Sequence, residues 1–584
     1  MNERLKHHLT HLKRRLRIRT FRSSLSSLEA APQFALLGIL AGLFTGFIII
    51  AFRWVVETTL NLLLPAGPES FEQLDRIDRF LLPVAGALTL ALMFSFLKLS
   101  DRQLGVTYVL RRLQQHQGYI PLRSLFIQFI AGALALISGQ TGGREGPAIH
   151  LGAATSSYLG QVLKLPNNSM RVLIGCGAAA AIGSSFNTPI AGVIFSMEVI
   201  VMEYTVAGFM PVILAAVTGT LIVQQVFGDA PIFQVPGIGM DSFWDLPWVL
   251  IEGILIAVLA AGLIRLMIAT QKHAPQSIAL RFILAGGCTA ALGLAVPQIL
   301  GIGYDSVSEA LLGNLPLFML LCIAATKLIA TAVNLGLGMP IGLIGPTLVI
   351  GALAGGSFWQ LASTFSNTLS EPGFYVILGM GAMMGAALQA PLAALMALVE
   401  LTRNPEIVLP AMACIVVAHI TVANGFRLPS IFQAQATMLG QDLHRNAMSL
   451  TLSRASVESV MSRNFVTTER YLTVTQANAL LTQKPDWILI KDEDNNLLLS
   501  AADLSRALAS SEVESTQDQL DLKSIPGERK NIAKVTWQAT LDEAFDIIAR
   551  KHVEALYVVR VPAPLVEHPV GIVLPTDIER FYKS

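Results

Sequence analysis

Long apolar runs dominate the first 440 positions of this chain. Six runs are weakly charged and long enough to cross a bilayer as single helices. They cover 34–56, 81–99, 206–227, 245–269, 279–300 and 405–424. Shorter runs interrupted by glycine or proline are 171–189, 340–356 and 374–391. Interrupted runs suit helices buried among protein neighbours better than helices that face lipid.

Composition supports a polytopic membrane protein, because 53% of the 584 residues are hydrophobic and only 14% are charged. Eight Lys or Arg residues lie within positions 1–22 against one acid, Glu3. By the positive-inside tendency, this basic segment at 1–33 is expected to be cytoplasmic rather than to bind nucleic acid. Four cysteines at unrelated spacings in apolar segments predict neither a metal site nor a disulfide.

One apolar region carries two adjacent charges. Arg144 and Glu145 lie within the glycine-rich stretch 138–153. An ionisable residue inside a membrane is costly, so it usually faces a pathway or a paired partner. Glycines interrupt helices and let backbone N–H groups face a cavity, where an anion can replace their missing partners. An aqueous loop is the alternative for this peptide alone.

The apolar region contains an internal repeat. The block 177–198 resembles the block 379–400, and their prolines, glycines and terminal glutamates lie 202 residues apart. Five small residues also recur 199 residues later: Gly143, Gly146, Pro147, Gly152 and Ala153 as Gly342, Gly345, Pro346, Gly351 and Ala352. Two homologous halves with interrupted segments at matching positions predict a transport site near the bilayer midplane, where the repeats meet.

Beyond about residue 440 the chain is polar, and short strands alternate with amphipathic helices. The first unit, about 454–510, contains strands at 487–490 and 497–499 around a turn at 492–496. The second unit, about 525–582, contains a helix at 541–551 and a strand at 555–560. This α/β tail, 441–584, resembles a tandem pair of CBS domains and is expected to be cytoplasmic.

With these parts assembled, residues 34–440 resemble the CLC family of chloride channels and chloride/proton antiporters. The peptide at 143–147 matches the family's most characteristic motif. The peptide at 342–346 is similar to the second anion-binding motif, with Ile344 where the family usually has Phe. The resemblance implies a polytopic helical membrane domain with an inverted repeat, and a homodimer with one anion pathway per subunit.

The resemblance also implies the site. Glu145 is expected to be the gate and the proton-exchanging group, since its carboxylate can occupy the place of a transported anion. Helix N-termini, each with roughly half a positive charge, are expected to attract that anion. The implied anion-binding residues are Leu104, Gly105, Gly143, Arg144, Gly146, Gly342, Leu343, Ile344, Gly345 and Phe432. A Glu145 carboxylate held permanently by Arg144 is the alternative.

The chain departs from the family at both hydroxyl donors. Leu104 stands where the family has a serine, and Phe432 where it has a tyrosine. Chloride preference is therefore open, with fluoride, nitrate or bicarbonate as alternatives. Thr107 offers a substitute hydroxyl, although local backbone bonding is the more ordinary role for a threonine.

Proton coupling is open as well. Val199 replaces the internal glutamate of the proton-coupled members. Glu203 lies four residues further on, on the same face if the helix continues, although a solvated carboxylate at the membrane interface is the more ordinary role for it. A passive channel gated by Glu145 is the rival of an antiporter. The sequence lacks Gly-x-Ser-x-Gly, His-Glu-x-x-His and a P-loop, so no enzyme is predicted.

The CBS resemblance implies an adenine nucleotide as a possible ligand of the tail. Ser500 and Asp503 retain the ribose-binding element in the first unit, whereas the second keeps only Thr576 and Asp577. A purely structural tail is the alternative, and a nucleotide receptor with a membrane anchor is a further one. No other cofactor and no metal are expected. The predicted location is the cell's inner membrane, with many crossings and both termini cytoplasmic.

Overall fold

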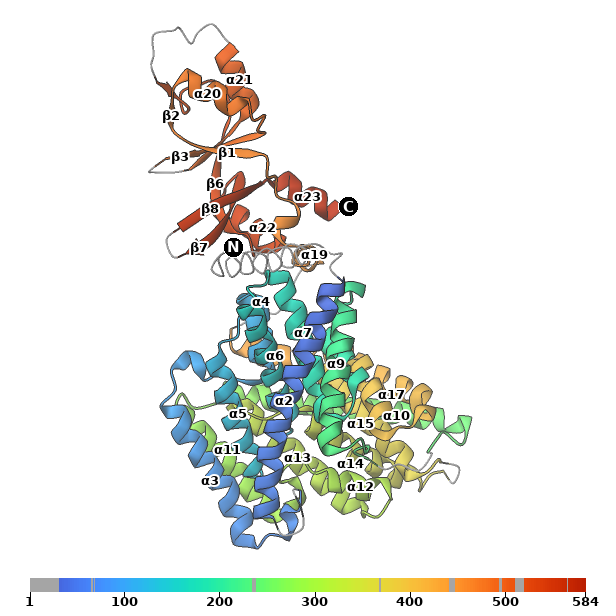
Figure 1. The fold of residues 1–584 in the computed structure, drawn as a ribbon. Helices are drawn as coiled ribbons and strands as arrows, with labels where there is room; N and C mark the ends of the chain where they lie inside the picture. The colour runs from blue at the N-terminus through green and yellow to red at the C-terminus, as the bar shows by residue number, and fades with distance from the viewer. Residues whose placement is uncertain are drawn as a thin grey trace, which may run out of the picture. The chain divides into compact units, whose positions relative to one another are not determined.

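The computed structural model describes residues 31–64, 67, 69–233, 238–366, 369–440, 447–492, 496–509, 519–563 and 566–583 (Figure 1). The chain divides into a helical unit, 34–163 with 170–443, and a second unit of 1–33, 164–169 and 444–584. Most of the basic segment at 1–33, and the centre of the predicted turn at 492–496, lie outside the described residues.

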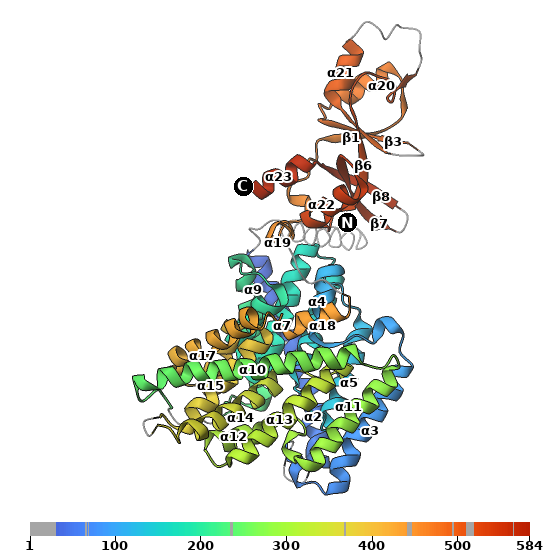
Figure 2. The same ribbon diagram turned by 180° about the vertical axis from the view of Figure 1, so that it is seen from behind.

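The helical unit consists of two series of helices in the same order. The first series is α2 (Ala31–Leu63), α3 (Arg76–Ser95), α4 (Gly105–Gln115), α5 (Leu122–Ile137), α6 (Glu145–Val162), α7 (Asn167–Phe186), α8 (Pro189–Phe195) and α9 (Val206–Phe227). The second is α10 (Leu246–Lys272), α11 (Ile278–Ala295), α12 (Tyr304–Leu311), α13 (Leu317–Leu337), α14 (Ile344–Ala362), α15 (Pro372–Leu388), α16 (Pro391–Thr402) and α17 (Val408–Ile420). Figure 2 shows α10 crossing the other helices of the second series. A further helix, α18 (Ile431–Met438), comes after α17 along the chain. The duplication seen in the sequence therefore reappears as helix order.

Nine helical segments among the described residues are long and apolar enough to cross a membrane. Six of them coincide with the six predicted runs, and the others are α7, α13 and α14. In α7 and α14, 94% and 78% of the most apolar window is buried, against 33–50% in the other seven. The interrupted segments thus lie in the interior, as their pattern predicts. α13, whose apolar run contains Lys327, is not among the predicted runs.

Glycine lets corresponding helices of the two halves pack closely. A Cβ at Gly152 of α6 would lie 2.2 Å from the carbonyl oxygen of Gly177 in α7. The equivalent pair, Gly351 of α14 and Gly379 of α15, gives the same 2.2 Å. Van der Waals contact between small residues is the main source of helix association in lipid. Each half therefore packs the helix that begins at its glycine-rich peptide, α6 or α14, directly against the helix that follows, α7 or α15.

Two glutamates join the halves reciprocally. Glu198, in the π-helical turn η3 (Ser196–Val201) that extends α8, accepts from the N–H groups of residues 392–393 at 3.2 and 2.9 Å. Glu400 of α16 accepts from the N–H groups of residues 190–191 at 3.0 and 2.7 Å. Each carboxylate thus satisfies the first turn of the other half's helix, where the unpaired N–H groups carry positive partial charge. The two halves therefore bind each other through equivalent residues.

The tail contains a six-stranded sheet in the order β1-β3-β4-β6-β7-β8. Its first unit is β1 (Phe465–Glu469), α20 (Val474–Leu481), β3 (Trp487–Lys491), β4 (Leu497–Ser500) and α21 (Ala501–Ala509). Its second is β6 (Arg529–Thr536), α22 (Leu541–Lys551), β7 (Ala555–Ala563), β8 (Val566–Val573) and α23 (Pro575–Lys583). In both units the first two strands are parallel and the third is antiparallel to the second. The tail is thus a repeated β-α-β-β-α unit, joined by antiparallel pairing of β4 with β6.

We expect Glu400→Gln to lower the thermal unfolding temperature of the detergent-purified protein, measured by tryptophan fluorescence. The amide keeps the shape but loses the charge that complements the start of α8, and hydrogen bonds to charged groups contribute about 1.5–3 kcal/mol. Glu371→Gln is the matched control, since Glu371 is exposed and makes no side-chain cap bond. Equal unfolding temperatures for the two variants would contradict this role of Glu400.

Candidate functional site

The two glycine-rich peptides meet at the centre of the helical unit. The N–H of Gly143 donates to the carbonyl of Gly342 at 2.9 Å, and the N–H of Gly342 donates back at 2.7 Å. These residues are repeat equivalents and pair antiparallel. A Cβ at Gly342 would lie 2.5 Å from the nitrogen of Gly146, closer than real Cβ atoms approach. The pairing therefore requires glycine, and it brings the starts of α6 and α14 together.

The side chain of Glu145 lies between the starts of α6 and α14, which this pairing brings together. Its side chain is 1% exposed, and Oε1 accepts from the N–H of Gly345 at 2.8 Å, in the first turn of α14. The backbone N–H groups of Ile344 and of Glu145 itself also favour negative charge on the carboxylate. Oε2 has no hydrogen-bond partner among the described residues. The carboxylate thus lies at the positive end of a helix from the opposite half, a position that attracts small anions.

Arg144 does not hold the Glu145 carboxylate. Its Nη1 lies 3.4 Å from Oε1 of Glu57, and the same oxygen accepts from Nε of Arg53 at 3.0 Å. The Arg144 guanidinium also lies over the ring of Phe186, 5.6 Å from its centroid. The alternative of a permanent Arg144–Glu145 pair is therefore wrong: the arginine is occupied elsewhere, and backbone N–H groups bind the carboxylate.

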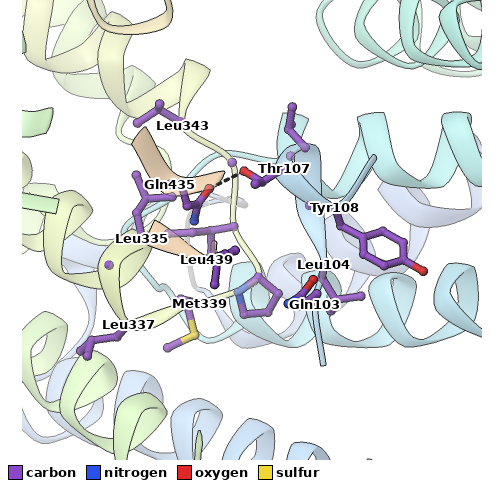
Figure 3. A pocket seen from close by; sticks show the side chains of 18 of the residues that line it. Gln103, Leu104, Thr107, Tyr108, Leu335, Leu337, Met339, Leu343, Gln435 and Leu439 are labelled. Carbon is purple, nitrogen blue, oxygen red and sulfur yellow. Dashed lines mark hydrogen bonds between the residues drawn. The ribbon is translucent and has the colours of Figure 1, made fainter. Parts of the chain in front are cut away.

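Most of the predicted site residues line one cavity of about 350 Å³. They are Leu104, Gly105, Glu145, Gly146, Gly342, Leu343, Ile344 and Phe432. Figure 3 shows Leu104 and Leu343, from different segments of the chain, among the side chains that line this cavity. Gly143, Arg144 and Gly345 are outside this lining, although Gly143 and Gly345 bind the residues that form it.

The charges around this cavity favour an anion. Among the described lining residues, Glu145 is the one acid, whereas Arg102 and Arg281 also line the cavity. Sequence reasoning missed both arginines, because single arginines beside apolar segments give no pattern. Their guanidinium groups bind backbone carbonyls, those of Leu97 and Pro275, which fixes their positions. With Glu145 neutral or displaced, the cavity lining would carry positive charge only.

The predicted role of Gly105 as an anion-binding residue needs correction. Its N–H donates to Oε1 of Gln128 at 2.9 Å and to Nδ1 of His150 at 3.1 Å. A donor engaged by two protein acceptors is not available to an anion. Leu104 and Phe432 do line the cavity, so the two positions without hydroxyl groups face the predicted path.

Thr107 does not replace the missing hydroxyls either. Its Oγ1 donates to Oε1 of Gln435 at 2.6 Å, the dashed line of Figure 3. This bond joins α4 to α18 across the cavity wall. The hydroxyl is therefore committed to a side chain rather than to the local backbone.

The helix does not continue to Glu203. The π-helical turn ends at Val201, and Met202 adopts a left-handed backbone with φ of 57°. Glu203 consequently lies beyond the helix rather than on the same helical face as Val199. Since Glu198 binds the start of α16, the path of a proton to Glu145 does not follow from these two residues.

The tail residues occupy equivalent places at the starts of α21 and α23. Ser500 precedes α21 and accepts from the N–H of residue 502 at 3.3 Å, and Asp503 binds Nη2 of Arg506 at 2.5 Å. Asp577 accepts from the N–H of Leu574 at 3.0 Å, and Thr576 is exposed. Both acids thus have local partners that a nucleotide would have to displace.

Comparison with known proteins places the chain in a family. The family model for voltage gated chloride channels matches residues 85–423. A ClcB-like protein from Ralstonia nicotianae is 32% identical over 370 residues, covering 61% of this chain and 84% of that protein. A ClcA H(+)/Cl(-) exchange transporter from Vibrio parahaemolyticus is 27% identical, over 51% of this chain and 67% of its own length. The chain belongs to the voltage-gated chloride channel, or CLC, family.

Solved structures show the same fold. A slow cyanobacterial Cl-/H+ antiporter aligns with a TM-score of 0.60 at 22% identity, covering 70% of this chain and 98% of its own. A eukaryotic CLC transporter aligns with a TM-score of 0.58 at 18% identity, covering 93% of this chain and 97% of its own, so the likeness extends into the tail. The expected CLC fold is confirmed, and the names of these proteins agree with a transporter rather than an enzyme.

We expect Gly342→Ala to destabilise the protein and abolish anion transport. The new Cβ would lie 2.5 Å from the nitrogen of Gly146 and 2.7 Å from Oε1 of Glu145, and overpacking costs about 1–3 kcal/mol. Gly287→Ala in α11 is the control, because no heavy atom of the described residues outside its own stretch of helix lies within 4 Å of its Cβ. Thermal unfolding and liposome flux measure both effects. Transport by Gly342→Ala at the control rate would contradict the glycine requirement.

Proposed function

We propose that this protein transports a small monovalent anion, chloride first, across a membrane through a CLC-type pathway gated by Glu145. One observation carries the proposal: the Glu145 carboxylate binds the N–H of Gly345 at the start of α14. Glu145 also lines the cavity, and it is the one acidic residue among the described residues of that lining. A carboxylate in that place competes with an anion for the same donors.

The geometry supports a simple gating cycle. An anion enters the cavity, where Arg102 and Arg281 favour negative charge. It cannot bind the N–H groups of α14 while the Glu145 carboxylate occupies them. Protonation of the carboxyl, or its displacement by the anion, frees those donors and lets the anion pass. The carboxyl group would then exchange its proton with the solution.

The choice of ions rests on the relatives. The ClcA proteins are named as H(+)/Cl(-) exchangers, and a fluoride/proton antiporter aligns with a TM-score of 0.58, covering 69% of this chain and 97% of its own. Chloride exchange against protons is therefore the first hypothesis for this chain. A passive channel is the alternative, because Val199 stands where the proton-coupled members have an internal glutamate. Fluoride, nitrate or bicarbonate are alternative anions, because Leu104 and Phe432 lack hydroxyl groups.

For the tail we propose a cytoplasmic CBS pair with a regulatory or scaffolding role. The repeated β-α-β-β-α order supports this assignment, as does the likeness to a eukaryotic CLC transporter over 93% of the chain. The basic segment at 1–33 supports a cytoplasmic N-terminus. We also propose an inner-membrane homodimer with one anion pathway in each subunit, in keeping with the family.

We expect Glu145→Gln to remove most of the pH dependence of chloride flux and to abolish proton movement. The amide keeps the shape of the protonated carboxyl but cannot ionise or carry a proton. Chloride and proton fluxes are recorded together from liposomes, with Glu371→Gln as the control. Wild-type pH dependence in the folded variant would reject Glu145 as the gate. Uphill proton movement driven by a chloride gradient in the parent protein separates an antiporter from a channel.

We expect the tail to bind adenine nucleotide weakly, because Asp503 and Asp577 already have local partners. Calorimetry of the full-length protein with ATP, ADP and AMP measures this, with Asp577→Ala and Asp577→Asn compared. Loss of a saturable signal in Asp577→Ala would support nucleotide binding. If ATP, ADP and AMP all gave no heat of binding at millimolar concentration, nucleotide binding would be rejected and the tail would have a scaffolding role.

A further inference from the structure

The loop of residues 299–304 is held rigidly beside the start of α14. Fully buried Lys327 of α13 donates to the carbonyls of Ile299 and Gly301, each at 3.1 Å. The N–H of Gly301 donates to the carbonyl of residue 139 at 3.1 Å. At the other end, the N–H of Tyr304 donates to Oε2 of Glu69 at 3.2 Å. These bonds fix where the side chain of Tyr304 begins.

The Tyr304 side chain extends from this loop toward the gate. It is 7% exposed, and its ring packs edge-on against Phe233 with centroids 5.3 Å apart. A Cβ at Gly345 would lie 3.4 Å from the Tyr304 hydroxyl oxygen. Gly345 is the residue whose N–H binds Oε1 of Glu145. The hydroxyl and the carboxylate thus both lie against one residue of α14.

Two buried polar atoms at this place have no hydrogen-bond partner among the described residues. They are the hydroxyl oxygen of Tyr304 and Oε2 of Glu145. A buried hydroxyl without a partner is costly, and each such group in a native structure calls for an explanation. Tyr304 also has a fixed ring, so its donor cannot turn away to solvent. A ligand that accepts hydrogen bonds would satisfy it.

We infer that the Tyr304 hydroxyl donates to the small anion that takes the place of the Glu145 carboxylate at the start of α14. This inference rests on the proposed function of the cavity. Tyr304 would thus supply a side-chain hydroxyl donor to the pathway, in which Leu104 and Phe432 have no hydroxyl group. The donor comes from α12 in the second half of the repeat, next to Gly345, rather than from the lining at Leu104 and Phe432. Tyr304 is therefore a specificity-determining residue.

The test uses the full-length protein in the Glu145→Gln background, where no carboxylate competes for the site. Tyr304→Phe removes the hydroxyl and keeps the ring against Phe233. Tyr158→Phe is the matched control, because Tyr158 on α6 is 44% exposed. Calorimetry with sodium chloride should show about tenfold or greater weakening of chloride binding in Tyr304→Phe, as expected for a lost hydrogen bond to a charged group. The control should bind as the parent does.

Incorporation of 3-fluorotyrosine at position 304 supplies a second variant that keeps the hydroxyl and nearly the same size. Its stronger donor should tighten chloride binding relative to tyrosine, a change that a purely structural role would not produce. Unchanged chloride affinity in either variant, with normal thermal unfolding, would overturn the role of Tyr304. If the Glu145→Gln parent itself neither bound nor transported chloride, the proposed anion path would be wrong, and the role of Tyr304 would be lost with it.

Discussion

The candidate site depends on one contact, the binding of a buried carboxylate to a backbone N–H group at the start of a helix from the other half. That contact requires α6 and α14 to begin within hydrogen-bond distance of each other, which the antiparallel pair of Gly143 and Gly342 achieves. Roughly half a positive charge at a helix N-terminus attracts an anion without committing a full countercharge. An arginine in the same place would bind more tightly and release more slowly. Arg144 is kept away by Glu57, so the site retains this moderate attraction.

The sequence predicts the parts of this site better than their bonding. Adjacent charges among glycines mark Glu145, and the repeat at 199 residues marks its partner peptide, because both are local patterns. The engagement of the Gly105 amide by Gln128 and His150 could not be predicted, since those residues lie 23 and 45 positions away. The same holds for Arg102 and Arg281, which a tertiary arrangement alone brings to the cavity.

The errors at helix level have physical causes too. α13 is absent from the predicted runs although its sequence contains one charge, and that residue, Lys327, is buried and binds two carbonyls. A shared helical face for Val199 and Glu203 would have required a continuous helix, but the helix ends at a left-handed Met202, for which the sequence shows no local signal. In the tail, the repeated strand order follows the predicted pattern closely, because alternation of apolar strands and amphipathic helices is a strong local signal.

The reciprocal bonds of Glu198 and Glu400 have a consequence for the time course of synthesis. The start of α8 finds its acceptor on a residue made about 200 positions later, so the first half leaves the ribosome with that helix end unsatisfied. The start of α16, by contrast, finds Glu198 already present when it emerges. The first half therefore cannot reach its final packing alone. When the second half folds, the hydrogen bonds at the starts of α8 and α16 form together.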